Sequence, residues 1–280
     1  MATNNYTSQE LMVAVAAREI RDGDAVFVGM RLPILAYAVA LSTHAPNALG
    51  LFEVGLMRDR PADAFLGTMG DPPNVAGAVW ATRMSNVMAL MAQGHVDLGF
   101  IGGAEVDRFG NLNTSYVGDP TKPTVKLPGS GGGADIAILS RRWVTLMNHE
   151  RRRLVDRVSF VTSPGYGDGS PGWRKRNGIL GGGPVAIITT LCVFRFPEGG
   201  GEAFVATVHP GHTVAVAKKP MRAASKDQFF ALLGRVSLND ANSSQRLSKT
   251  PGHFSVDLPT LAKEWTQSFE GEGHETPKSS

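Results

Sequence analysis

Glu53 stands first among the residues that could do chemistry, because it follows the apolar run 49–52 directly. A carboxylate at the end of a buried strand is costly to remove from water, so it requires a partner, solvent or a chemical function. Gly55, two residues later, leaves room for a ligand or for another stretch of backbone. Two interpretations stay open at this point: a reactive carboxylate, or an ordinary acid that serves as a cap or lies in a partly solvated loop.

A glycine-rich segment, 129–133, is the second candidate, with four glycines in five residues. It lacks both the lysine of a phosphate-binding loop and the spacing of a dinucleotide-binding fingerprint. Consecutive glycine N–H groups can still bind an anion. A surface loop without a ligand explains the same composition equally well.

Three other groups of polar residues are better explained by structure than by catalysis. Asp107 and Asn111 bracket a glycine turn, in which such side chains bond to their own backbone. Cys192 lies in an apolar run and is expected to be a small core residue. The nearest histidine pair, His209 and His212, fits a turn, and the histidines do not recur at metal-ligand spacings. No metal site is therefore predicted.

The elements that position these residues are predicted from short apolar runs that alternate with helical patterns. Helices are expected from a capping box at Thr7 to about residue 21, at 33–43 and at 81–93; strands are expected at 25–28, 49–52, 96–101, 136–139, 143–147, 158–161, 185–190 and 204–208. Continuously apolar strands need cover on both faces, which predicts an α/β protein with a largely parallel open sheet and helices on both faces. Ligands of such sheets bind beyond the carboxyl ends of the strands.

Composition sets the class of the protein. Of the 280 residues, 42% are hydrophobic and 19% are charged, which excludes a disordered chain. One cysteine excludes a disulfide framework and a cysteine-rich metal site. Because no internal repeat or linker interrupts the pattern, residues 1–270 are expected to form a single domain. The polar segment 271–280 is expected to be a disordered tail.

Charge and hydropathy limit the cell compartments and the classes of partner that are expected for this chain. No apolar run reaches the length of a membrane span, and the polar N-terminus carries no secretion signal, so a cytoplasmic protein is expected. The net charge is +3, and positive charge gathers locally in the arginine runs 141–142 and 151–153. No aromatic residues interleave with these runs as in single-strand binders, so neither a nucleic-acid nor a membrane partner is predicted.

Several motifs recur in the order and spacing of one known family. They are Gly29–Pro33, Phe52–Met57, Phe100–Asn111, Pro128–Asp135, His149–Arg153 and Val161–Gly165. Over roughly residues 4 to 215 the chain resembles the B (β) subunit of family I CoA-transferases, most of all glutaconate CoA-transferase. The resemblance implies the CoA-transferase-like fold.

The resemblance also implies a mechanism. In that family a glutamate just after a strand is the covalent nucleophile, and Glu53 occupies the matching position. The reaction would be a ping-pong exchange through a glutamyl-CoA thioester, between a donor acyl-CoA and an acceptor acid such as the dicarboxylate glutaconate. Coenzyme A would be a substrate, and no cofactor would be bound permanently.

The same resemblance suggests residues around the nucleophile. Gly131 and Gly132 would supply backbone N–H groups to the oxyanion, and Gly29 would line the acyl pocket. Arg31 could pair with the distal carboxylate of a dicarboxylate substrate. Glu105 stands where relatives commonly carry glutamine, which would put a second carboxylate near the site in a role that stays open.

The family builds its active site between two kinds of subunit. This chain lacks the Gly-Gly-Phe segment of the A (α) subunit, so the resemblance implies a CoA-transferase α subunit as partner, in an A2B2 or larger assembly. Two rival functions remain: an acyl-CoA C–C hydrolase or decarboxylase on the same fold, and a metabolite-binding domain without catalysis. Val54 stands where many family members have a polar neighbour of the nucleophile, which points to an apolar acyl group or to altered chemistry.

Overall fold

A computed structural model describes residues 6–64 and 66–217. The helices are α1 Ser8–Ala17, α2 Leu32–Thr43, α3 Pro72–Val75, α4 Met84–Ala92, α5 Gly133–Leu139, α6 Trp173–Arg176 and α7 Val214–Ala217. The strands are β1 Ala25–Phe27, β2 Leu49–Phe52, β3 Leu56–Arg58, β4 Trp80–Ala81, β5 Leu98–Ile101, β6 Glu105–Asp107, β7 Leu112–Asn113, β8 Tyr116–Val117, β9 Val125–Lys126, β10 Arg142–Met147, β11 Leu154–Val155, β12 Pro184–Thr189, β13 Cys192–Arg195 and β14 Phe204–Val208. The expected tail at 271–280 and the end of the expected domain lie outside the described residues.

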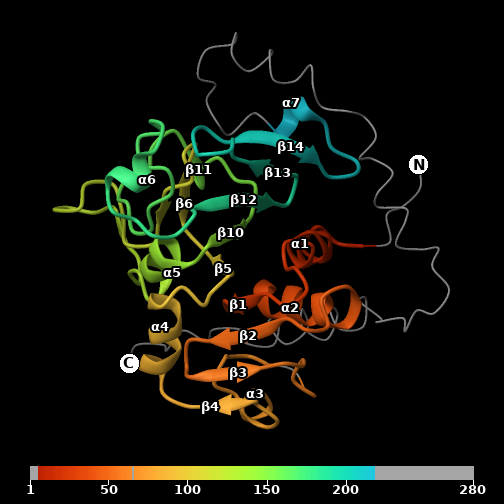
Figure 1. The fold of residues 1–280 in the computed structure, drawn as a ribbon. Coiled ribbons are helices and arrows are strands. Elements are labelled where there is room, and N and C mark those ends of the chain that lie inside the picture. The colour runs from red at the N-terminus through yellow and green to blue at the C-terminus, as the bar shows by residue number, and fades with distance from the viewer. Residues whose placement is uncertain (1–5, 65, 218–280) are drawn as a thin grey trace, which may run out of the picture.

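One nine-stranded sheet organises the fold, in the order β14-β13-β12-β10-β5-β1-β2-β3-β4 (Figure 1). The five central strands, from β12 to β2, pair in parallel. Antiparallel strands flank them: β13 and β14 on one side, β3 and β4 on the other. The predicted α/β class with a largely parallel sheet is confirmed.

Helices cover both faces of the sheet, and each face has its own core. On one face α1 and α2 pack Met12, Ala16 and Ala40 against sheet residues such as Val26 and Phe100. On the other face α4 and α5 supply Val87, Met91 and Ile136 to a second core that includes Trp143. Figure 1 shows these two helix pairs on opposite sides of the central strands. This arrangement explains why the strands are apolar on both faces.

The first helix starts as the sequence predicts. The Thr7 hydroxyl accepts the Glu10 N–H at 3.2 Å, and the Glu10 carboxylate accepts the Thr7 N–H at 2.5 Å. Each side chain thus satisfies a backbone donor that the first turn of a helix would leave without a partner.

Two predicted strands are wrong. Residues 136–139 belong to α5, because a run of four apolar residues fits a buried helix turn as well as a strand. Residues 158–161 form no strand; the chain pairs earlier, at β11, and the side chains of Phe160 and Val161 are 36% and 49% exposed. Their apolar character therefore marks surface rather than core.

Candidate functional site

The carboxyl ends of β1, β2 and β5 meet at one edge of the sheet. In the parallel pairing of β1 with β2, Phe27 lies opposite Leu51, and the Val28 N–H continues the ladder by donating to the Leu51 carbonyl at 2.9 Å. Gly29 and Glu53 therefore leave their strands at the same level. The neighbouring strand β5 ends beside them at Ile101. This is the edge at which open α/β sheets bind ligands.

A tight turn fixes Glu53 between β2 and the antiparallel strand β3. The Gly55 N–H donates to the Phe52 carbonyl at 3.0 Å, and the Gly55 carbonyl accepts the Thr82 N–H at 2.7 Å. Gly55 has φ +99°, and a Cβ there would stand 2.3 Å from the Thr82 carbonyl oxygen. Only glycine fits this position, because the backbone of the segment before α4 closes over it.

The Glu53 carboxylate lies directly against Gly132. A Cβ on Gly132 would stand 3.2 Å from Oε1, 3.3 Å from Cδ and 3.4 Å from Oε2 of Glu53. Glu53 is half-buried, and within the described part of the chain its carboxylate makes no hydrogen bond or ion pair. The structure thus brings together two residues that are 79 positions apart in the sequence.

The glycine-rich segment turns into α5 beside this carboxylate. Gly129 and Gly131 have φ +105° and +47°, and a Cβ on either would meet no atom within 4 Å. Gly132 is the N-cap of α5. The next residue, Gly133, lies close to Ile101 at the end of β5 and to the Ser163 hydroxyl, with its ideal Cβ position 3.4 Å and 3.3 Å away. The loop therefore has open space beside Gly129 and Gly131.

The segment after β1 is conformationally strained. Arg31 has φ +66° and ψ −121°, the only positive φ of a non-glycine residue within 6–64 and 66–217. Such a conformation costs on the order of 1–3 kcal/mol and is concentrated at functional sites. Arg31 is exposed and precedes α2, whereas Gly29 packs against Phe100, with a Cβ position 3.1 Å from the Phe100 carbonyl oxygen. Both predicted residues lie at the same sheet edge as Glu53.

Glu105 lies in a buried network of its own. Its carboxylate accepts the Asn113 side-chain amide at 2.7 Å, the Ser159 N–H at 3.0 Å and the Ser159 hydroxyl at 3.2 Å. These contacts join β6 to β7 and to the segment at 159. They satisfy the carboxylate internally, which favours a structural role for Glu105 over contact with substrate.

The turn at 107–111 behaves as its residue types predict. The Asp107 carboxylate accepts the backbone N–H groups of Phe109 and Asn111, each at 3.0 Å. The Asn111 side-chain carbonyl in turn accepts the N–H groups of Gly165 and Gly167. Burial raises the pKa of Asp107 above its usual range, although these hydrogen bonds oppose the shift. The pair ties the loop at 165–167 to β6.

Ser163 is not singled out by the sequence patterns, yet its side chain is fully buried beside Gly133. Its hydroxyl has no hydrogen-bond partner among the described residues. A buried hydroxyl without a partner is unusual and indicates a group or water that the protein receives there. The only signal in the sequence was its place in the motif Val161–Gly165.

An apolar surface borders the Glu53 turn. Val54, Val79, Trp80 and Met84 are 45%, 53%, 39% and 54% exposed, and we call them the edge patch. They lie on the turn, on or beside β4, and at the start of α4, which the Gly55–Thr82 contact holds together. Exposed apolar residues that lie in one region of a fold are typical of an interaction surface.

The described residues contain neither a candidate metal-ligand cluster nor a candidate membrane-spanning helix. Across residues 6–64 and 66–217, no three His, Cys, Asp or Glu side chains group as metal ligands would. No helix within the same residues is long and apolar enough to cross a membrane.

Comparison with known proteins identifies the family. Residues 10–219 match the family model described as Coenzyme A transferase. The chain belongs to the coenzyme A transferase family. It is 38% identical over 209 residues to the B (β) subunit of 3-oxoadipate CoA-transferase from Pseudomonas knackmussii, covering 74% of this chain and 80% of that one.

Two solved structures share the fold of this family member. Glutaconate coenzyme A-transferase from Acidaminococcus fermentans superposes with a TM-score of 0.73 at 28% identity, covering 82% of this chain and 94% of that one. The sequence of the B (β) subunit of that enzyme is 33% identical over 212 residues, covering 74% of this chain and 79% of its own length. The decarboxylase AibA/AibB superposes with a TM-score of 0.66 at 31% identity, covering 78% and 84%. The predicted CoA-transferase-like fold is confirmed.

Proposed function

We propose that this chain is the β subunit of a CoA-transferase that moves CoA from a donor acyl-CoA to an acceptor carboxylic acid. The observation that carries the proposal is the Glu53 carboxylate, held against Gly132 without a hydrogen-bond partner in the described residues. A carboxylate without protein donors keeps its lone pairs for an incoming carbonyl carbon. Similarity to the β subunits of two named CoA-transferases supports the same reaction.

The reaction consists of two matched half-reactions. The Glu53 carboxylate attacks the thioester carbonyl of the donor, the carbon–sulfur bond breaks, and a mixed anhydride and CoA thiolate result. The thiolate then attacks the Glu53 carbonyl, which releases the donor carboxylate and leaves a glutamyl-CoA thioester. The acceptor carboxylate attacks this thioester, and the same two steps run in reverse to restore Glu53. Exclusion of water protects the anhydride from hydrolysis.

The glycine segment beside Glu53 suits stabilisation of the tetrahedral intermediates. We assign the Gly131 and Gly132 N–H groups as donors to the oxyanion, since loss of one such donor typically costs about 3–4 kcal/mol. A side chain at 132 would press on the nucleophile itself. We assign Gly29 to the wall of the acyl pocket, and Arg31 to the distal carboxylate of a dicarboxylate such as glutaconate.

The edge patch supports a protein partner at this site. A second polypeptide seated on Val54, Trp80 and Met84 would cover apolar surface next to Glu53 and exclude water from it. We infer that this polypeptide is a CoA-transferase α subunit, in an A2B2 or larger assembly. Coenzyme A enters this scheme as a substrate rather than as a resident cofactor.

Decarboxylation of an acyl-CoA is the second candidate, favoured by the structural match to the decarboxylase AibA/AibB and by the apolar Val54 beside Glu53. A product assay of the two-subunit complex separates the candidates. The complex is supplied with succinyl-CoA or glutaconyl-CoA and with short dicarboxylic or 3-oxo acids. Transfer yields a new acyl-CoA without gas and disappears in Glu53→Gln, whereas CO₂ released from the acyl-CoA only when the complex is present, and still released by Glu53→Gln, contradicts the proposal.

A further inference from the structure

A cavity of about 400 Å³ lies under α1, far from Glu53. It is lined by Val15, Arg18, Glu19, Arg21, Arg142, Val185, Val193, Arg195 and Thr207. These residues come from the end of α1 and the segment after it, and from β10, β12, β13 and β14. Four strand positions separate β12 from β2, which corresponds to about 19 Å at the usual strand spacing. The cavity is therefore distinct from the Glu53 site.

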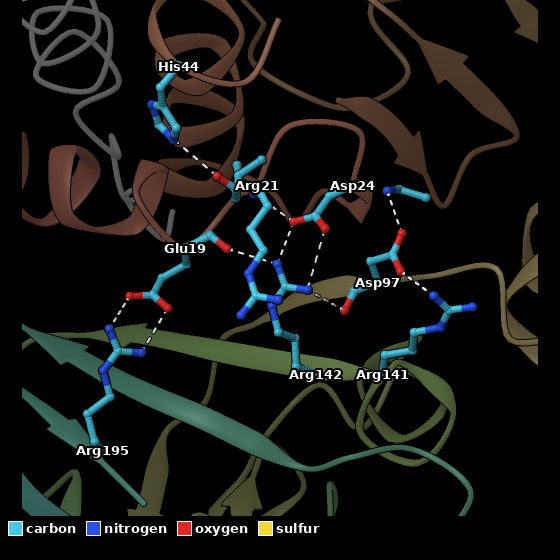
Figure 2. A network of polar contacts seen from close by, with 10 residues as sticks. Glu19, Arg21, Asp24, His44, Asp97, Arg141, Arg142 and Arg195 are labelled. Carbon is cyan, nitrogen blue, oxygen red and sulfur yellow. Dashed lines mark hydrogen bonds and ion pairs between the residues drawn. The ribbon is translucent and has the colours of Figure 1, made fainter. Parts of the chain in front are cut away.

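Two of its four arginines are fixed by internal ion pairs, as Figure 2 shows. The Arg195 guanidinium donates to both oxygens of the Glu19 carboxylate, at 2.8 Å and 2.5 Å. Arg142 pairs with Asp24 and also donates to the Glu19 carbonyl at 3.0 Å. These contacts hold one wall of the cavity rigid and leave little of either charge available.

The other two arginines remain available. The side chains of Arg18 and Arg21 are exposed, and neither makes a hydrogen bond or ion pair within the described part of the chain. Four guanidinium groups meet only two carboxylates here, those of Glu19 and Asp24, so the cavity carries two positive charges in excess. Exposed guanidinium groups that are not held by a carboxylate can bind phosphate oxygens in a bidentate manner.

The rest of the lining restricts what the anion can be. Val15, Val185 and Val193 give the cavity an apolar side, and the exposed Thr207 adds a hydroxyl donor. The volume falls within the range of small-molecule sites. Inorganic phosphate would leave most of this space and the valine surface unused. A ligand with two phosphoryl groups and a flat apolar base uses all three features.

We propose that this cavity is a binding site for a nucleoside diphosphate. Arg18 and Arg21 bind the two phosphoryl groups, Thr207 donates to a phosphate or ribose oxygen, and the base packs on the three valines. This proposal does not depend on the reaction at Glu53. Strand β12 of the cavity is four strand positions away from β2, and the cavity uses none of the residues assigned to transfer.

Isothermal titration of the full-length chain with ADP, AMP and pyrophosphate tests the assignment. ADP should bind, and AMP and pyrophosphate should each bind at least several-fold more weakly. The double variant R18Q/R21Q should weaken ADP binding by ten-fold or more, and Thr207→Val should weaken it several-fold. The matched control, R60Q/R151Q, removes two positive charges from exposed residues outside the cavity and should leave ADP affinity unchanged.

Each alternative outcome overturns the proposal in a different way. Coenzyme A itself carries an adenosine diphosphate group, so ADP could bind beside Glu53 instead; such binding would survive R18Q/R21Q intact. Equal losses in R18Q/R21Q and R60Q/R151Q would reduce the effect to overall charge. Pyrophosphate binding as tight as that of ADP would show that the valine side is not used. Melting curves verify that each variant is folded.

Discussion

Glu53 and Gly132 form the smallest unit on which the proposed chemistry depends. All three terminal atoms of the Glu53 side chain lie within 3.4 Å of the space that a Cβ on Gly132 would fill. Contacts this short force one partner to move by a few tenths of an ångström. In the proposed transfer, a displaced Glu53 carboxylate would lose the alignment with the thioester carbonyl that accounts for much of the rate.

Gly132→Ala should therefore reduce kcat by about ten-fold or more, with only a small change in melting temperature. Steady-state kinetics of the assembled complex measure this effect. Gly70→Ala is the control, because a Cβ there meets no atom closer than 4.0 Å and should leave kcat unchanged. Full activity in Gly132→Ala would mean that Glu53 does not react from the position described.

The sequence predicts only part of this arrangement. The sequence shows Glu53 directly after an apolar strand, and this position is unusual because a carboxylate there is costly to bury. The contact of Glu53 with Gly132 does not follow from the pattern, since pattern analysis sees only neighbours along the chain. The same limit applies to Glu105, whose partner Ser159 is 54 residues away and gives the carboxylate a structural environment.

The turn between β2 and β3 holds the Glu53 side chain in place. Gly55 combines a left-handed conformation with a backbone approach that no side chain permits. Gly94, by comparison, has φ +79° but faces open space. The two glycines separate the cost of backbone strain from the cost of steric overlap.

Gly94→Ala should lower the free energy of unfolding by about 1–2 kcal/mol, the cost of a left-handed residue with a side chain. Gly55→Ala should lower it by more, because the Thr82 and Arg83 backbone cannot move aside like a flexible side chain. Denaturant unfolding of both variants compares the two costs. Equal losses of unfolding free energy in the two variants would show that the backbone at 82–83 moves away from residue 55 at no cost.

A buried histidine at the end of β14 contacts the end of β12, and its protonation should affect stability. The His209 ring lies 2.9 Å from the Thr189 carbonyl oxygen, and burial lowers its pKa from the usual 6.5. The unfolded chain therefore binds a proton more readily than the folded one. The resulting stability is present above pH 6.5 and is lost as the pH falls through the folded pKa.

His209→Gln, which retains an N–H donor, should reduce the loss of melting temperature between pH 7 and pH 5. His95→Gln is the control, because His95 is exposed and should leave the pH slope as it is. Thermal unfolding across this pH range gives both slopes. A slope unaltered by His209→Gln would exclude His209 as a source of acid sensitivity.

The elements also show where sequence patterns reach their limit. The capped first helix and strands β1 and β2 were predicted because a capping box and an apolar run each have a local cause. Residues 136–139 were assigned to a strand, because four apolar residues do not distinguish a strand from one helical turn. The apolar run at 158–161 proved to be partly exposed surface, which depends on neighbours that the pattern does not contain.

For the whole molecule, the edge patch and the Glu53 turn lie on the same region of the fold. A partner that covers Trp80 and Met84 would also close the site, so assembly and catalysis should fail together. Trp80→Glu and Met84→Glu should each weaken association with the α subunit by ten-fold or more. Leu180→Glu, at a residue that is 83% exposed outside the patch, is the control.

Analytical ultracentrifugation of the two co-expressed polypeptides measures the association of each variant. Complexes that form normally with both patch variants would place the partner on another surface.

Covalent loading of Glu53 with CoA can be detected on the tryptic peptide that carries this residue. Residues 32–58 contain one side-chain carboxyl group, that of Glu53, so any label on this peptide is located without ambiguity. The complex is incubated with an acyl-CoA, treated with hydroxylamine or borohydride, digested and examined by mass spectrometry. A hydroxamate or alcohol should form on this peptide in the native protein and should be absent in Glu53→Gln. An unmodified peptide from a complex that turns over the same acyl-CoA would contradict covalent loading of Glu53.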